Sequence, residues 1–160
     1  MAPRARPSAS TGAAAERGVR PTGAMTFLRF VVATRDPDSG VEEGLFRAAY
    51  TLRRSRNTTA DHRRALEEIL SWFDSHLPTP KRFNRTSSKG FYRRNARGIA
   101  WFRDSAHEHL LRMHQLRVIL QRCGYSVEMI REDRIGYIVY EDAVQVVAEP
   151  FSDTRTGTGR

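Results

Sequence analysis

The most continuous apolar run in the chain is FLRFVVAT at positions 27–34, which is rich in aromatic and β-branched residues. Short runs of this composition are typical of a strand that is covered on both faces. The residues that follow, from Asp36 to Gly40, are strong turn formers. We therefore expect a buried strand at 27–34, followed by a turn.

A first helix is predicted directly after this turn. Ser39 and Glu42 have the spacing of a capping box, so the helix is expected to begin there. Apolar residues then recur with the helical period on one face, at Val41, Leu45, Ala48, Ala49 and Leu52. Asn57 is suited to the left-handed conformation that ends a helix.

A second helix follows within a few residues. Thr58 and Asp61 repeat the spacing of the first cap, and Pro78 and Pro80 stop the helix. Its apolar face consists of His62, Leu66, Ile69, Leu70, Phe73 and Leu77. Because the connection between the two helices is so short, we expect them to pack as an antiparallel αα-hairpin.

The C-terminal half predicts a third helix and three strands. Ser105 and Glu108 again have capping-box spacing, and the helix is expected to run to Cys123, with Gly124 ending it. Alternating apolar residues then predict strands near 127–131, 137–140 and 144–148, separated by turns.

The resulting order is β-αα-(basic segment)-α-βββ, which indicates an α+β fold. We expect an antiparallel sheet packed against helices on one face, with the last three strands forming a meander. The αα-hairpin, the third helix and a terminal hairpin also permit a winged-helix-like arrangement. In that arrangement Arg63 and Arg64 would join a nucleic-acid contact surface.

The composition divides the chain into three parts. Residues 1–24 are poor in large apolar groups and rich in Ala, Pro, Arg and Gly, which predicts a disordered basic N-terminal extension. Residues 25–151 are enough for a single α+β domain with one modest core. Residues 152–160 are small and polar, and we expect them to be a disordered tail.

Positive charge is concentrated between residues 81 and 103, which we call the basic segment. It carries eight cations and no carboxylate, whereas the formal net charge of the whole chain is +9. The cations are Lys81, Arg82, Arg85, Lys89, Arg93, Arg94, Arg97 and Arg103, and the interleaved aromatics are Phe83, Phe91, Tyr92, Trp101 and Phe102. Charges further apart than a Debye length of ~8–10 Å are screened, so a local excess indicates one binding surface.

Arginines that neutralise phosphates, together with aromatic rings that stack on bases, are typical of nucleic-acid-binding surfaces. We therefore predict a non-catalytic nucleic-acid-binding protein, with DNA or RNA as its partner. The predicted phosphate contacts are Arg85, Arg93, Arg94 and Arg97, with Lys89 assisting, and the predicted stacking residues are Phe91 and Tyr92.

Part of the basic segment is expected to belong to the fold. The stretches 91–94 and 99–102 read as two strands of a hairpin around a turn at 95–98. Trp101 and Phe102 lie just before the third predicted helix, so we expect them to anchor the segment in the core.

Two alternative functions stay open. The chain could be an enzyme acting on a nucleotide or nucleic acid, with acidic residues holding Mg²⁺ beside the basic segment. Glu149 is the acid to test, because it lies in an otherwise apolar strand, whereas the other acids of this half are typical of turns or helix N-termini. Alternatively, the basic segment could bind an acidic protein partner, which would make the chain an adaptor.

Other chemistry finds little support in the sequence. There is no P-loop, and His107, His109 and His114 lack zinc-site spacing, so no metal or other cofactor is expected. Cys123 is the single cysteine, which is typical of a reducing, cytoplasmic location. No apolar run approaches the ~20 residues that span a bilayer, so no membrane partner is expected. The preference for arginine over lysine is typical of a GC-rich, bacterial-type genome.

The stretch 136–141 (GYIVYE), with Gln145 beyond it, resembles the closing strand of ADP-ribosyltransferases of the poly(ADP-ribose) polymerase type. The stretch 98–102 (GIAWF) resembles their earlier nicotinamide-site strand. Gly136 stands where that family has its catalytic glutamate, Gln145 is one residue late, and the chain has no His-Gly pair. We therefore interpret the likeness as convergence on strand-like composition.

Overall fold

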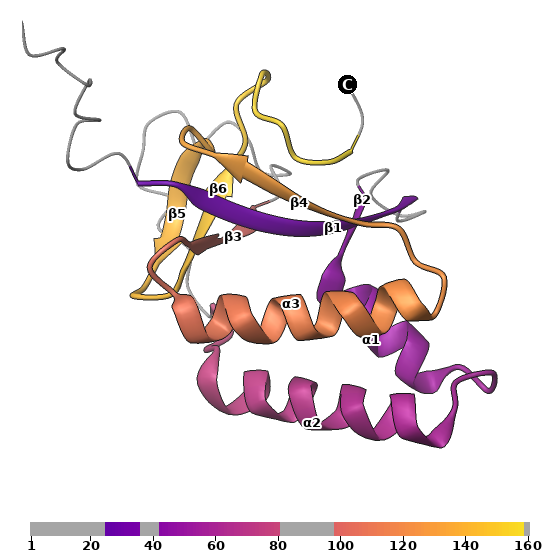
Figure 1. Cartoon of the computed structure of the whole chain (residues 1–160). Coiled ribbons are helices and arrows are strands. Elements are labelled where there is room, and N and C mark those ends of the chain that lie inside the picture. Colours follow the sequence, from indigo (N-terminus) through magenta and orange to yellow (C-terminus); the bar gives the residue numbers. More distant parts are fainter. Residues whose placement is uncertain (1–24, 36–41, 81–97, 159–160) are drawn as a thin grey trace, which may run out of the picture.

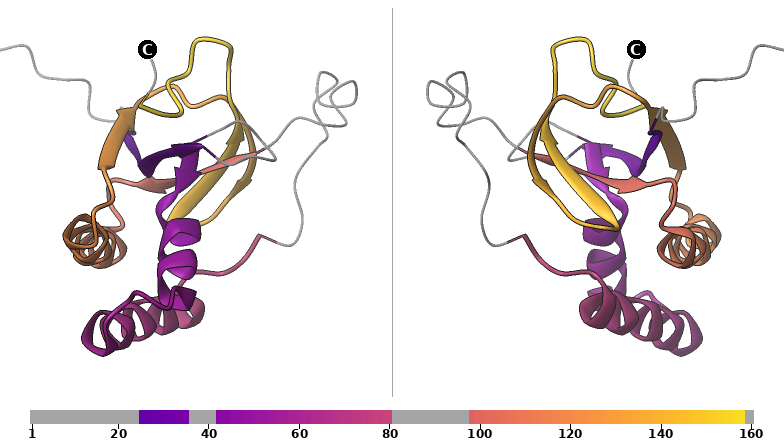
Figure 2. Two further views of the ribbon diagram at one scale, coloured as in Figure 1. Left: turned by 90° about the vertical axis from the view of Figure 1, so that its right-hand side faces the viewer. Right: turned by 90° about the vertical axis from the view of Figure 1, so that its left-hand side faces the viewer.

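A computed structural model describes residues 25–35, 42–80 and 98–158. In these residues six antiparallel strands form one sheet, and three helices lie together on one of its faces (Figure 1). Both views in Figure 2 show the helices on one side of the sheet and the C-terminal residues on the other. The predicted α+β class, with an antiparallel sheet packed against helices, is confirmed. The winged-helix-like arrangement differs from what is observed, because α1 and α3 pack against one extended sheet and α2 packs on these two helices (Figure 1).

The strand order across the sheet is β4–β1–β3–β6–β5, and the short β2 pairs with the far end of β1. The bounds are β1 Phe27–Arg35, β2 Glu42–Gly44, β3 Ile99–Arg103, β4 Val127–Glu132, β5 Tyr137–Glu141 and β6 Gln145–Glu149. β1 is central: one edge pairs with β4 along its length, and the other pairs first with β3 and then with β2. This position explains why residues 27–34 are almost continuously apolar.

The predicted meander of three strands is only partly correct. β5 and β6 form the expected antiparallel hairpin, but β4 pairs with β1 and lies at the opposite edge of the sheet from β5. Ile135 belongs to the connection between β4 and β5 and is buried with Trp101 and Val146. Alternation along a strand predicts that the strand exists but does not specify its partner, which here depends on the insertion of β3 between β1 and β6.

The helices are α1 Leu45–Arg54, α2 Ala60–His76 and α3 His107–Arg122. The predicted start of the first helix is wrong: Glu42 belongs to β2, and Gly44 is the N-cap of α1. For α2 the cap is Thr59, whose side chain accepts a hydrogen bond from the backbone amide of His62 at 3.2 Å. α3 begins after Ala106 with no side-chain cap, and ends before Gly124, whose φ of 92° fits the predicted stop.

Two apolar clusters cover the two faces of the sheet. The larger one joins β1 and β3 to the buried faces of all three helices, through residues such as Phe30, Leu66 and Leu120. The smaller one lies on the face turned away from the helices and consists of Phe27, Val31, Trp101, Ile130, Ile135, Val146 and Ala148. The sheet therefore has a core on each side, and side chains alternate between the two cores along β1.

Residues 152–158, which the sequence assigns to a disordered tail, are described in the structure and lie against the sheet. We call residues 151–158 the C-terminal strap. Arg155 forms an ion pair with Glu128, and Thr158 donates to the Glu42 carboxylate through both its amide and its hydroxyl. These contacts explain the difference, because polar partners on β2 and β4 order a segment that has little apolar surface of its own.

Candidate nucleic-acid interface and its anchors

All seven predicted contact residues lie in the part of the basic segment that falls outside the described residues. They are Arg85, Lys89, Phe91, Tyr92, Arg93, Arg94 and Arg97. The expected strand at 91–94 lies there as well. The structure does describe both flanks, namely the end of α2 with the residues up to Pro80, and the start of β3 at Ile99. These flanks show how the segment is attached to the fold.

The N-terminal flank is tied to the sheet by one buried glutamine. Gln145 is 4% exposed, and its Nε2 donates to the backbone carbonyl of Pro78 at 2.7 Å. Pro78 follows α2 directly, and Gln145 is the first residue of β6. A buried side-chain amide left without an acceptor is unfavourable, so this contact holds the chain close to the point where it leaves the helix.

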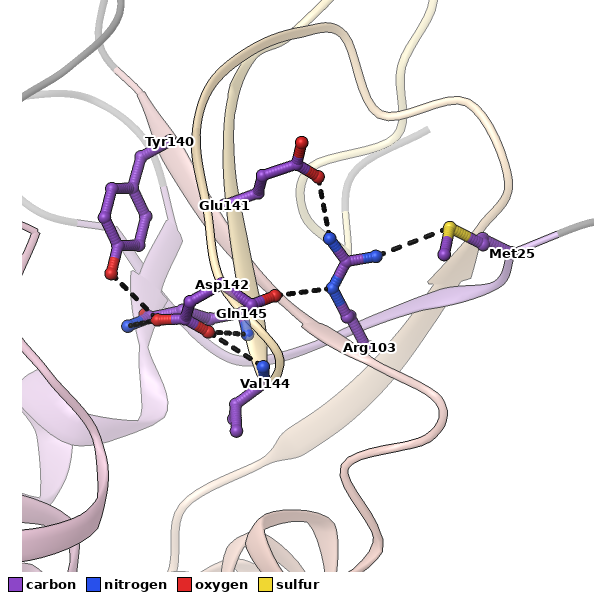
Figure 3. Close-up of polar contacts among 7 residues, drawn as sticks. All are labelled: Met25, Arg103, Tyr140, Glu141, Asp142, Val144 and Gln145. Carbon is purple, nitrogen blue, oxygen red and sulfur yellow. Dashed lines mark hydrogen bonds and ion pairs between the residues drawn. The ribbon is translucent and has the colours of Figure 1, made fainter.

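Asp142 organises the surrounding turn between β5 and β6 (Figure 3). Its carboxylate accepts hydrogen bonds from the backbone amides of Val144 and Gln145, both at 2.8 Å, from the Tyr140 hydroxyl at 2.9 Å and from Gln145 Nε2 at 3.2 Å. Burial by itself raises the pKa of Asp142, but these hydrogen bonds outweigh it and the net pKa is lowered. Asp142 is therefore a structural acid that is held in its charged form.

The C-terminal flank is built into the centre of the sheet. Trp101 is 1% exposed and Phe102 is 8% exposed, which confirms that they anchor the segment in the core. Arg103, the last cation of the segment, donates through Nε to the Asp142 carbonyl at 2.8 Å and pairs through Nη2 with Glu141 at 2.7 Å (Figure 3). Seven of the eight cations are therefore left as candidates for external contacts.

Because Arg103 is engaged within the fold, Arg103→Gln is expected to change stability and to leave ligand binding unaffected. Loss of the ion pair and the hydrogen bond is expected to lower the free energy of unfolding by about 1–2 kcal/mol. Urea unfolding measures this effect, with the exposed Arg131→Gln as the control, which is expected to change stability by less than about 0.5 kcal/mol. A stability equal to that of the wild type would contradict the structural role of Arg103.

A second group of polar and aromatic side chains lies where α2 ends. His76 stacks on Trp72, with ring centroids 4.3 Å apart, and the Arg112 guanidinium lies 4.8 Å from the centre of the Trp72 ring. His109 places Nε2 2.8 Å from the His76 carbonyl, which joins α3 to the end of α2. Sequence reasoning considered His109 only as a zinc ligand, which its spacing disfavours, and did not identify Trp72 or Arg112. Residues four apart lie on the same face of a helix, so the contact between Trp72 and His76 could have been predicted from their spacing.

The predicted alternatives gain no geometric support. Glu149 is buried within β6 at 8% exposure, and the part of the chain described here contains no group of three His, Cys, Asp or Glu side chains that could hold a metal ion. Arg63 is committed to the fold, because its guanidinium donates to the carbonyls of Arg53, Ser55 and Thr58. Sequence reasoning also missed that Cys123 Sγ lies 3.5 Å from His62 Nδ1. This contact joins the C-terminal end of α3 to the start of α2.

The geometry at Gly136 separates this chain from the ADP-ribosyltransferases that it resembles. Gly136 has a φ of 130°, and a Cβ at this position would lie 1.9 Å from the carbonyl oxygen of Glu149. A glutamate therefore cannot occupy the position that corresponds to the family's catalytic residue without moving the backbone of β6.

None of the described helices is both long and apolar enough to cross a bilayer. Comparison of the chain with protein-family models, with curated proteins and with solved structures found no match, so its function has to be argued from its own residues.

Proposed function

We propose that this protein is a non-catalytic nucleic-acid-binding protein that contacts phosphates through residues 81–97. The observation that carries the proposal is the charge pattern. With Arg103 assigned to the fold, seven cations remain in residues 81–97, with no carboxylate among them and with Phe83, Phe91 and Tyr92 between them. The partner is DNA or RNA in the cytoplasm, where a chain with one cysteine stays reduced.

The attachment of the segment at both ends supports this proposal. Gln145 holds the chain at Pro78, and β3 pairs with β6 from Ile99 onward. Both flanks of residues 81–97 are therefore joined to β6. Binding through a segment that is attached at both ends loses less conformational entropy than binding through a free chain end.

Two carboxylates at the β5–β6 turn are engaged within the fold. Glu141 is paired with Arg103, and Asp142 accepts hydrogen bonds from two backbone amides and two side chains. Arg103 compensates the charge of Glu141, so this carboxylate opposes the approach of phosphate less than a free carboxylate would.

The test is fluorescence anisotropy with short labelled single- and double-stranded DNA and RNA, titrated at low and at physiological salt. Arg93→Ala/Arg94→Ala/Arg97→Ala is expected to reduce the slope of log K against log salt by about two to three units, because three phosphate contacts are lost. The nucleic acid that binds most tightly identifies the partner class.

A matched control separates a local interface from general attraction. Arg54 and Arg122 are exposed at the ends of α1 and α3, and Arg56 is exposed in the connection between α1 and α2. Their triple alanine variant removes the same charge, and its salt slope is expected to change by less than about one unit. Equal losses in both variants would refute the assignment to residues 81–97. If the wild type does not bind at low salt, the nucleic-acid proposal fails and the acidic protein partner takes its place.

A further inference from the structure

Arg29 lies among apolar side chains on the face of the sheet that is turned away from the helices. It is on β1 between Phe27 and Val31, and side chains two residues apart in a strand share a face. β4 places Ile130 directly opposite Arg29. On the other side, β3 pairs Phe27 with Arg103 and Leu28 with Phe102, so Trp101 is next in register to Arg29. Arg29 therefore has the buried Ile130 as its neighbour on one strand and the buried Trp101 next in register on the other.

Among the described residues, two backbone carbonyls accept hydrogen bonds from Arg29. Nε donates to the carbonyl of Thr156 at 3.2 Å and Nη1 to the carbonyl of Ala100 at 3.3 Å, whereas a guanidinium has five N–H donors. No carboxylate of the described residues lies within ion-pair distance of it. Burial lowers the pKa of Arg29 to about 10, an effect that the negative charge of Glu42 partly offsets. A partly buried cation without a close counter-charge is unfavourable for folding, which indicates a role other than stability.

Trp101 supplies a second donor beside Arg29. Its indole Nε1 is buried and finds no hydrogen-bond acceptor among the described residues. Buried donors in native proteins are nearly always paired. The two neighbouring side chains therefore share a surplus of donors and a shortage of acceptors.

Within the part of the chain that the structure describes, the C-terminal strap provides one acceptor that reaches Arg29 from outside the sheet, the carbonyl of Thr156. Residues 155–158 of the strap are held by polar contacts at two sides, between Arg155 and Glu128 and between Thr158 and Glu42. Its first residues are held separately, by packing of Phe151 on Tyr137 and by the ion pair between Asp153 and Arg134. A Cβ on Gly157 would lie 2.8 Å from Glu42 Oε2, so the strap passes close to β2. Ion pairs and hydrogen bonds at a surface are individually weak, so this strap can be displaced at a smaller cost than a packed apolar segment.

We propose that Arg29 and Trp101 form a binding site for an oxyanion, a phosphate or carboxylate group, which the C-terminal strap covers with the Thr156 carbonyl in the position of one ligand oxygen. An oxyanion offers several acceptor oxygens, whereas the carbonyl offers one, and it also brings a negative charge closer to Arg29 than Glu42 lies. The site lies on the sheet and does not depend on residues 81–97.

Competition between strap and ligand determines the affinity that is measured. When only a fraction of the molecules has the strap displaced, the apparent dissociation constant exceeds the intrinsic one by the inverse of that fraction. Weakening the strap should therefore tighten binding without any change at Arg29 or Trp101.

The indole N–H signal of Trp101 reports on the site directly. The chain has two tryptophans, so a ¹⁵N-labelled sample gives two indole signals, which Trp72→Phe assigns. The full-length protein is titrated with inorganic phosphate and, separately, with acetate, in chloride at constant ionic strength. The Trp101 signal is expected to move downfield and to saturate, with a dissociation constant on the order of a millimolar, while the Trp72 signal stays in place. The anion that binds more tightly shows whether phosphate or carboxylate is preferred.

Three variants complete the test. Thr158→Val removes the hydroxyl donor to Glu42 and is expected to tighten binding several-fold, whereas Ser152→Ala, an exposed strap position, leaves it unchanged. Arg29→Met is expected to weaken binding at least about tenfold. If the methionine variant does not fold, Arg29→Lys, which keeps the charge, takes its place in the test. The proposal is overturned if neither anion moves the Trp101 signal in the wild type or in Thr158→Val, or if Arg29→Met and Arg29→Lys bind as tightly as the wild type.

Discussion

Replacing Gly136 with alanine is expected to lower the free energy of unfolding by about 3–5 kcal/mol, which is large for the addition of one methyl group. Two causes act together. The φ of 130° is rarely adopted by residues with a side chain. The new Cβ would also lie 1.9 Å from the Glu149 carbonyl oxygen and 2.8 Å from the Pro150 Cα, both of which are backbone atoms that cannot rotate away.

The other glycines of the fold provide matched controls for this substitution. Gly124 has a φ of 92° but open space around it, so Gly124→Ala is expected to cost about 1–2 kcal/mol from backbone strain alone. Gly44, the N-cap of α1, has a φ of −68° and no neighbour within 4 Å. Gly44→Ala should therefore lower the free energy of unfolding by little more than the ~0.5 kcal/mol that is typical of surface substitutions.

Urea unfolding of the three variants measures this order. A cost for Gly136→Ala no greater than that for Gly124→Ala would contradict the close approach of the β4–β5 connection to the backbone after β6. The prediction also bears on the resemblance to ADP-ribosyltransferases, because the same contact that makes alanine unfavourable excludes a glutamate.

Replacing Asp142 with alanine is expected to lower the free energy of unfolding by about 2–3 kcal/mol at neutral pH, because buried backbone amides lose a charged acceptor. The carboxylate accepts from the amides of Val144 and Gln145, and it also orients the Gln145 side chain toward Pro78. The loss should therefore loosen both the β5–β6 turn and the attachment of the basic segment.

The effect of Asp142 is expected to depend on pH in one direction. Its pKa is lower in the folded protein than its ordinary value of 3.8, so the folded state binds the proton less readily than the unfolded state. The stabilisation is therefore complete above that ordinary value and is lost as the pH falls through the folded pKa.

Asp142→Asn is the control for this pH dependence, because it keeps the shape and an acceptor oxygen but cannot titrate. The difference in unfolding free energy between the wild type and Asp142→Asn should be largest near pH 6 and should shrink as the pH falls below 3.8. A difference that stays constant from pH 6 to pH 2 would show that the charge of Asp142 contributes nothing to the turn.

The local pattern of the sequence predicted most elements of the fold but not their partners. The central strand, the three helices and the β5–β6 hairpin all follow from apolar periodicity within windows of ten to twenty residues. The exceptions arose where a local signal competed with tertiary contacts. Glu42 has capping-box spacing from Ser39, yet it lies in β2, where its carboxylate receives Thr158 from the other end of the chain.

For function, the sequence by itself determined the charge of residues 81–97 and the aromatic residues between them, because composition and order need no folding to be read. Only the tertiary structure decided that Arg103 is engaged by Glu141, that Gln145 holds Pro78, and that Arg29 lies beside Trp101 beneath the C-terminal strap. The physical reason is separation along the chain: these partners are 38 to 127 residues apart, and such pairs become neighbours only through the packing of the whole sheet.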